Sequence, residues 1–121
     1  MATILMIEDD KNFVRLVEKV LGQHGHTIIH AGTALNGLHL AEVDTVQLVL
    51  LDMDLPDLDG KVVATTLRAR PGKKDVPIIA VTAQTDAIAR RLALAFGCSG
   101  FIPKPIDTRI FPNQIRSYLE Q

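Results

Sequence analysis

Residues 48–60, LVLLDMDLPDLDG, join a hydrophobic run to four carboxylates. Asp52 ends the run, and Asp54, Asp57 and Asp59 follow within a few residues. One acidic residue after a buried strand has no special meaning. Several in this position could bind a cation, bind a phosphate through that cation, or cap a helix.

Other hydrophobic runs also end in polar residues. Glu8, Asp9 and Asp10 follow the first run, Thr82 the fourth and Lys104 the fifth. If Glu8, Asp9 and Asp52 lie together, their like charges need compensation. Mg²⁺ prefers oxygen ligands and commonly has a phosphate in its shell. Lys104 can offer positive charge to phosphate oxygens and Thr82 a hydroxyl, so these residues indicate a phosphoryl-transfer site.

These side chains meet only if the runs form one sheet. The hydrophobic runs are residues 3–7, 27–31, 47–51, 77–81 and 99–103. Between them lie helical faces with Phe13, Val17, Val20 and Leu21, with Ile88, Leu92 and Ala95, and with Phe111, Ile115 and Leu119; residues 34–43 and 60–69 have weaker helical patterns.

Strands that alternate with helices favour an α/β fold with a parallel sheet, because parallel strands need crossover connections. The nearly continuous apolar character of the runs indicates a sheet covered on both faces. Ligands of such sheets bind beyond the carboxyl ends of the strands. The sequence therefore places all the candidate residues along one edge.

Composition limits the function classes. The 121 residues, 47% hydrophobic and 22% charged, predict one compact domain over residues 1–121. A net charge of -1 argues against direct nucleic-acid binding.

The acidic N-terminus and short apolar runs predict a cytoplasmic protein with no membrane span. Cys98 is the single cysteine, which excludes an internal disulfide. Only Gln121 follows the last helical stretch, so we expect no output domain.

Four motifs in order, IEDD, LLDMDLP, VTA and PKPI, resemble the receiver domain of two-component response regulators of the chemotaxis-regulator-like type. The resemblance covers essentially the whole chain. It implies a flavodoxin-like doubly wound (βα)5 fold with five parallel strands in the order 2-1-3-4-5.

The resemblance also implies roles for the acidic residues. Asp52 matches the aspartate that accepts a phosphoryl group from a histidine kinase or phosphotransfer protein. Glu8 and Asp9 match the acidic pair that binds Mg²⁺ together with Asp52, and Asp54 matches the residue whose backbone carbonyl binds the metal.

The remaining matched positions concern the response to phosphorylation. Thr82 matches the hydroxyl residue that turns toward the phosphate, Lys104 the lysine that pairs with it, and Phe101 the aromatic switch residue. Pro105 matches a proline preceded by a cis peptide bond.

A receiver domain of this kind is a signalling phosphoacceptor that takes part in its own phosphorylation and dephosphorylation rather than an enzyme with a separate substrate. The aspartyl phosphate adds charge and biases two surface conformations. By resemblance, a downstream protein reads the face of the fourth and fifth helices and the fifth strand. We expect a monomer or a phosphorylation-dependent dimer.

Two positions depart from the common pattern. Phe101 lacks the hydroxyl of the tyrosine often present there. Asp54 places a carboxylate close to the expected path of the attacking water, and Gln84 lies in the same region. We predict that Asp54 and Gln84 set the lifetime of the phosphorylated state.

Other charged residues have structural interpretations. We expect Asp10, Asp59, Asp86 and Asp107 to cap helices. Asp57 is interpreted as a solvated turn residue. The basic stretch RARPGKK, residues 68–74, is interpreted as the exposed end of the third helix and its loop, with a docking site as the alternative.

Two other functions use some of the same residues. DMD followed by Leu-Pro resembles the Asp-x-Asp motif of haloacid-dehalogenase-type phosphohydrolases, although there the motif normally follows the first strand of a larger sheet. A pseudo-receiver that serves only as a docking surface would lack the acidic pair, the phosphoacceptor or the lysine, and all are present here.

Overall fold

The computed structural model describes residues 1–43, 45–84 and 86–121, in which strands and helices alternate. The strands are β1 (Thr3–Ile7), β2 (Thr27–Ala31), β3 (Leu48–Asp52), β4 (Ile78–Thr82) and β5 (Gly100–Pro103). The helices are α1 (Lys11–Gly22), α2 (Ala34–Leu40), α3 (Gly60–Ala69), α4 (Ala87–Ala95) and α5 (Phe111–Leu119). Among the described residues, no helix has the length and apolar character needed to cross a membrane.

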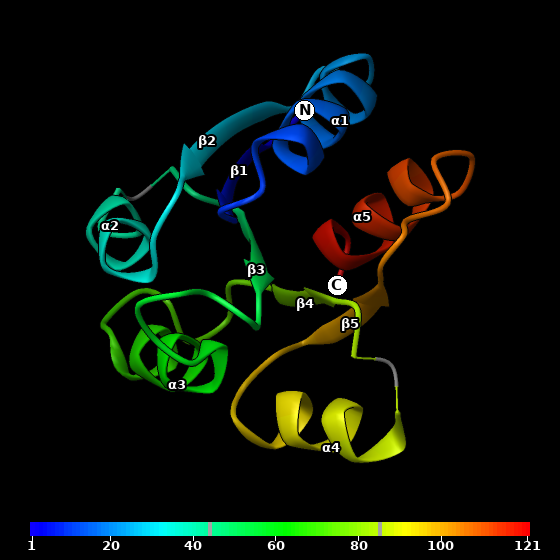
Figure 1. Ribbon diagram of the computed structural model, residues 1–121. Helices are drawn as coiled ribbons and strands as arrows, with labels where there is room; N and C mark the ends of the chain where they lie inside the picture. The colour runs from blue at the N-terminus through cyan, green and yellow to red at the C-terminus, as the bar shows by residue number, and fades with distance from the viewer. Residues whose placement is uncertain (44, 85) are drawn as a thin grey trace.

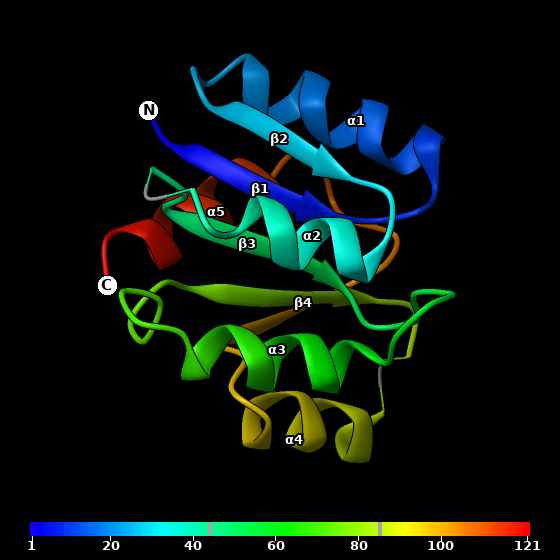
Figure 2. The ribbon, with the colours of Figure 1, turned by 90° about the vertical axis from the view of Figure 1, so that its left-hand side faces the viewer.

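The strands form one parallel sheet in the order β2-β1-β3-β4-β5. Helices α1 and α5 cover one face, and α2, α3 and α4 cover the other (Figures 1 and 2). The predicted fold class and strand order are therefore confirmed.

Alternation along the strands supplies a separate core to each face, because successive strand side chains point to opposite sides of a sheet. In β1, Leu5 and Ile7 pack beneath α2 and α3, whereas Ile4 and Met6 pack beneath α1 and α5. All four are almost completely buried. The central strands are thus fixed from both sides, and their carboxyl ends provide a rigid base for polar residues.

Several element boundaries differ from the sequence prediction. Strands β3, β4 and β5 each begin one residue later than the hydrophobic runs, and β3 and β4 also end one residue later, so that Asp52 and Thr82 are their final residues. Asp52 pairs with Val81, and Thr82 pairs with Pro103. Backbone pairing sets these limits, whereas the sequence pattern reports only side-chain polarity. Helix α2 ends at Leu40 instead of residue 43.

The capping predictions are correct for three of the four aspartates. Asp10, Asp59 and Asp86 accept hydrogen bonds from backbone amides in the first turns of α1, α3 and α4. The prediction for Asp107 is wrong, because α5 begins only at Phe111. Asp107 instead precedes a turn and binds the backbone amide and guanidinium of Arg109.

The interpretation of residues 68–74 as an exposed basic segment is also wrong in part. Arg68 is half-buried and donates to the carbonyl of Gly97 and the hydroxyl of Ser99, at 2.8 Å each. It also donates to the carbonyls of Lys73 and Val76. Lys73 is buried and donates to the carbonyl of Val43 at 3.0 Å. These two cations join neighbouring loops, which sequence proximity could not show.

Candidate functional site

Three carboxylates meet at the carboxyl edge of the sheet. Ile7 pairs with Leu51 across β1 and β3, so the residues that follow them in the chain, Glu8 and Asp52, are neighbours. Glu8, Asp9 and Asp52 each offer one oxygen atom, and these three atoms lie within 4.8 Å of one another. The sequence prediction that two different strand ends contribute to one acidic cluster is supported by this geometry.

Burial makes this cluster electrostatically costly. The exposed fractions are 2% for Glu8 and 6% for Asp52, whereas Asp9 is exposed. Burial, together with the charge of nearby Glu8, raises the pKa of Asp52 to about 7, against the opposing effects of the Asp54 amide and Lys104. The protein therefore holds Asp52 in an environment that an added positive charge would improve.

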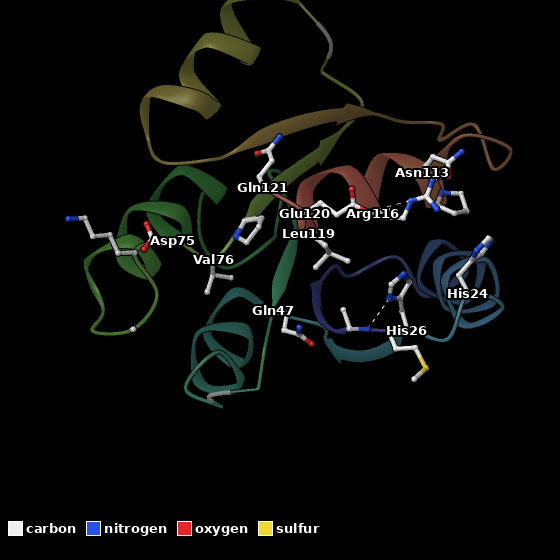
Figure 3. A pocket seen from close by; sticks show the side chains of 16 residues that line it. His24, His26, Gln47, Asp75, Val76, Asn113, Arg116, Leu119, Glu120 and Gln121 are labelled. Atoms are coloured by element: carbon white, nitrogen blue, oxygen red, sulfur yellow. Dashed lines mark hydrogen bonds and ion pairs between the residues drawn. The ribbon is translucent and has the colours of Figure 1, made fainter.

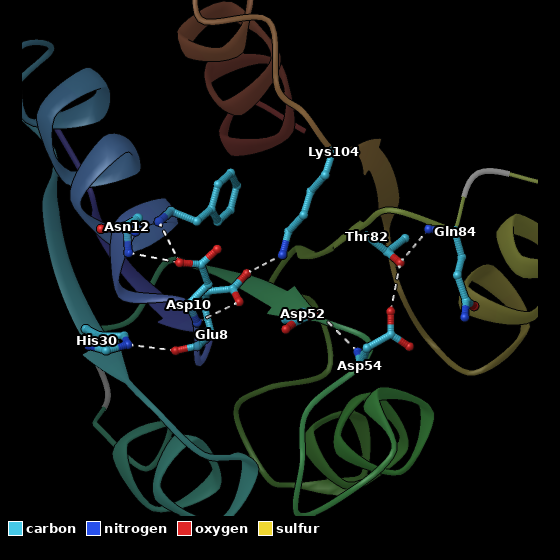
Figure 4. A network of polar contacts seen from close by, with 10 residues as sticks. Glu8, Asp10, Asn12, His30, Asp52, Asp54, Thr82, Gln84 and Lys104 are labelled. Atoms are coloured by element: carbon cyan, nitrogen blue, oxygen red, sulfur yellow. Dashed lines mark hydrogen bonds and ion pairs between the residues drawn. The ribbon is translucent and has the colours of Figure 1, made fainter.

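Lys104 brings a positive charge to this carboxylate cluster. Its Nζ lies 2.7 Å from Oε1 of Glu8, and the two side chains point toward each other (Figure 4). The resemblance implies that Lys104 pairs with the phosphoryl group, whereas in this structure its ammonium group pairs with the carboxylate of Glu8. The Lys104 amide also donates to the carbonyl of Thr82, and the Lys104–Pro105 peptide bond is cis, the isomer that the resemblance implies.

Two contacts at this edge were missed by sequence reasoning. Nζ of Lys104 lies 4.6 Å from the centroid of the Phe13 ring, a residue that the sequence assigned only to the core face of α1. Nε2 of His30 lies 2.8 Å from the backbone carbonyl oxygen of Glu8. Nothing in the sequence indicates that Lys104 will contact Phe13, because the two residues are far apart along the chain.

Thr82 ends β4, which lies on the opposite side of β3 from β1, so Thr82 and Glu8 are on opposite sides of Asp52. Its Oγ1 is 3.5 Å from Oδ2 of Asp54 and accepts a hydrogen bond from the amide of Gln84 at 3.1 Å (Figure 4). The Asp54 amide in turn donates to Oδ1 of Asp52 at 3.0 Å. Thr82, Asp54, Gln84 and the half-buried Phe101 line one cavity of about 230 Å³. The structure therefore brings these four predicted residues together beside Asp52.

Asp57 does more than its interpretation as a solvated turn residue allowed. It is exposed, but its carboxylate accepts hydrogen bonds from the amides of Ala34 and Leu35, at 2.9 and 3.0 Å. These amides lower the pKa of Asp57. Because they belong to the first turn of α2, Asp57 ties the loop after β3 to a neighbouring helix.

A larger cavity, of about 930 Å³, lies at the opposite edge of the sheet, before the first residues of the strands. Its lining mixes basic and acidic side chains, including His24 after α1 and the pair Arg116 and Glu120 at the end of α5 (Figure 3). Because side chains of both charges line this cavity, it indicates neither an anionic nor a cationic ligand. The convergent carboxylates, hydroxyl and ammonium all lie at the carboxyl edge instead.

The donor set at the carboxyl edge fits a hard divalent cation. Three carboxylate oxygens at ligand spacing are the atoms that Mg²⁺ prefers, and a single ammonium group faces them among the described residues. A phosphoryl group beside Asp52 would then meet Lys104 on one side and Thr82 on the other. This arrangement suits phosphoryl transfer to a carboxylate.

Comparisons with known proteins agree with this chemistry. A family model described as the response regulator receiver domain matches residues 4–116. The chain is 31% identical over its full length to the transcriptional regulatory protein AfsQ1 of Streptomyces coelicolor and to CpxR of Escherichia coli K12, covering 52% and 50% of those proteins. It thus spans about half the length of these curated relatives.

Solved structures show the same architecture. A CheY-like receiver domain protein from Methanospirillum hungatei has a TM-score of 0.90 at 25% identity, with coverage of 99% of this chain and 94% of that one. The receiver domain of the sensor histidine kinase PA1611 from Pseudomonas aeruginosa also has a TM-score of 0.90 at 25% identity, with coverage of 99% and 98%. That structure has a magnesium ion coordinated in its active site cleft.

Proposed function

Because this chain belongs to the response regulator receiver domain family, we propose that Asp52 accepts a phosphoryl group in a Mg²⁺-dependent reaction. The observation that carries the proposal is the position of Asp52. It is a nearly buried carboxylate at the end of β3, clustered with Glu8 and Asp9, and Lys104 and Thr82 lie at the same edge of the sheet (Figure 4). Glu8, Asp9, Asp52 and the backbone carbonyl of Asp54 would hold the metal.

The chain's own residues would act as follows. An oxygen of ionised Asp52 forms a bond to the phosphorus, while the bond from phosphorus to the donor breaks and its electron pair leaves with the donor. Bound Mg²⁺ would supply positive charge for the transferring group. Lys104 would neutralise charge on the phosphoryl oxygens, and the Thr82 hydroxyl would donate a hydrogen bond to one of them.

The donor and the reader are protein partners in this proposal. A histidine kinase or a phosphotransfer protein supplies the phosphoryl group, and Thr82 and Phe101 respond to it. The added charge, roughly -1.5 to -2, then changes the surface that a downstream protein recognises. The chain thus serves as a signalling phosphoacceptor that promotes its own phosphorylation and dephosphorylation.

Three finer points stay predictions: that the domain acts without an output domain, that it makes no direct contact with nucleic acid, and that it is cytoplasmic. The curated relatives are about twice as long and include transcriptional regulators, so these points need their own test. The mass of the protein recovered from its own cells, and its retention on DNA, would decide the first two. Cell fractionation would decide the third.

The central test is the intact mass of the protein after incubation with acetyl phosphate, with and without Mg²⁺. We expect one phosphoryl adduct that requires Mg²⁺, is absent from Asp52→Asn and persists in the exposed control Asp75→Asn. Release of phosphate from small phosphomonoesters without an adduct would favour a phosphohydrolase. If neither an adduct nor phosphate release is observed, both reactions are contradicted and a domain that serves only for docking remains.

A further inference from the structure

We propose that Phe13 is a positioning residue that holds the ammonium group of Lys104 at the mouth of the carboxylate cluster. The inference rests on the proposed function, because it gives Phe13 a part in phosphoryl transfer to Asp52. No motif assigns this role: in the sequence, Phe13 is one of several apolar residues on the inner face of α1.

The geometry is that of a cation–π contact. Nζ of Lys104 is 4.6 Å from the centroid of the Phe13 ring, inside the ~6 Å limit at which such attraction matters. The Lys104 side chain is only 22% exposed, so water screens this attraction less than it would at an open surface. The ring is itself half-buried against the core beneath α1 and α5.

The backbone that carries Phe13 is tied to the acidic loop. Oδ1 of Asp10 accepts hydrogen bonds from the amides of Asn12 and Phe13, at 2.9 and 3.3 Å. The amide of Asp10 donates to Oε2 of Glu8 at 3.1 Å. Phe13 is therefore held in a fixed relation to the carboxylates that Lys104 faces.

Phe13 matters as a second partner for Lys104 because Glu8 also makes other interactions. One carboxylate oxygen of Glu8 accepts from Lys104, and the other accepts from the Asp10 amide. When Glu8 also serves as a metal ligand, its charge is shared and its hold on Lys104 weakens. An aromatic face attracts the ammonium group without using a carboxylate, so Lys104 stays beside Asp52 for the incoming phosphoryl oxygens.

A side chain of similar volume without a π face would fill the same space but would not hold the cation. Lys104 would then sample more rotamers, and its contribution to the transition state would fall. We expect the initial rate of adduct formation from acetyl phosphate to drop by about 2- to 10-fold in Phe13→Leu. Phe13→Tyr keeps the ring, so its rate should stay near that of the native chain.

The test compares these two variants with Leu16→Ala, an exposed position on the same helix, in saturating Mg²⁺. A second readout is independent of activity: the NMR signals of the Lys104 side-chain methylene next to Nζ. A ring current should shift them upfield in the native chain and in Phe13→Tyr. In Phe13→Leu the shift should be lost.

Equal rates for the native chain and Phe13→Leu would overturn the inference, as would an equal loss of rate in the leucine and tyrosine variants, which would indicate packing alone. Absence of an adduct in the native chain is a different result. It would refute the proposed function, and the positioning role with it, while the NMR shift would still report whether ring and ammonium touch.

Discussion

Nζ of Lys104 and Oε1 of Glu8 lie 2.7 Å apart although 96 positions separate the two residues in the chain. The pair joins the end of β5 to the end of β1 across the intervening strands β3 and β4. A candidate metal ligand therefore already has a cationic partner. The free energy of metal binding must include the partial loss of that ion pair.

Removal of the ammonium group should strengthen metal binding. We expect Lys104→Gln to bind Mg²⁺ more tightly by about 3- to 10-fold, because a partly exposed ion pair contributes about 1 kcal/mol and its cation also repels the metal. Isothermal titration calorimetry at fixed ionic strength measures this. Lys19→Gln, an exposed change on α1, is the control, and an unchanged or weaker affinity in Lys104→Gln would contradict the prediction.

The stability of the metal-free protein should depend on the protonation of Asp52. Its folded pKa, about 7, is above the unfolded value near 3.8, so the folded chain keeps a proton that the unfolded chain loses between these pH values. Stability should therefore decrease as pH rises from about 4 to about 7. Above pH 7, Asp52→Asn should be more stable than the native chain by about 1–3 kcal/mol.

Urea unfolding at pH 5 and pH 8, with chelator present, measures this dependence. Asparagine keeps an oxygen that can accept from the Asp54 amide, so the variant removes the charge and little else. The exposed Asp75→Asn is the control. The burial argument is wrong if Asp52→Asn gives no added stability at pH 8.

Gly60 should be required for the geometry of the site. A Cβ at Gly60 would lie 2.6 Å from the backbone Cα of Met53, the residue after Asp52. Since backbone cannot move aside cheaply, Gly60→Ala should lose about 1–3 kcal/mol of stability. It should also slow the phosphorylation of Asp52.

The matched control is Gly22→Ala, where a Cβ meets no atom within 4 Å. Gly22 ends α1, and alanine there should leave stability and phosphorylation rate near native. Thermal unfolding and adduct formation from acetyl phosphate report the two effects. Identical behaviour of the two alanine variants would show that Met53 tolerates the added methyl group.

Asp54 and Gln84 should shorten the lifetime of the phosphorylated state. Both line the cavity beside Thr82, where their polar atoms can orient a water molecule toward phosphorus. We expect Asp54→Ala and Gln84→Ala to prolong the lifetime by roughly 3- to 30-fold, less than the ~100-fold or more of a dedicated general base. Decay of the adduct mass after removal of acetyl phosphate measures it, with Asp75→Asn as control; unchanged decay in both variants would refute the assignment.

Much of the fold could be predicted from the sequence because its signals are local. Hydrophobic runs and helical faces identified the alternating elements, and Asp10, Asp59 and Asp86 were correctly assigned as caps, since a cap bonds to amides only two or three residues away. The strand order came from resemblance to a family rather than from the residues themselves.

The sequence by itself determined which polar residues stand at the strand ends and therefore share one edge of a parallel sheet. The tertiary structure alone decided their partners. It paired Lys104 with Glu8 and Phe13, and it bound the Asp57 carboxylate to amides in the first turn of α2. Hydrophobic periodicity depends on neighbours along the chain, whereas these contacts depend on strand order and register, which set distances between residues remote in sequence.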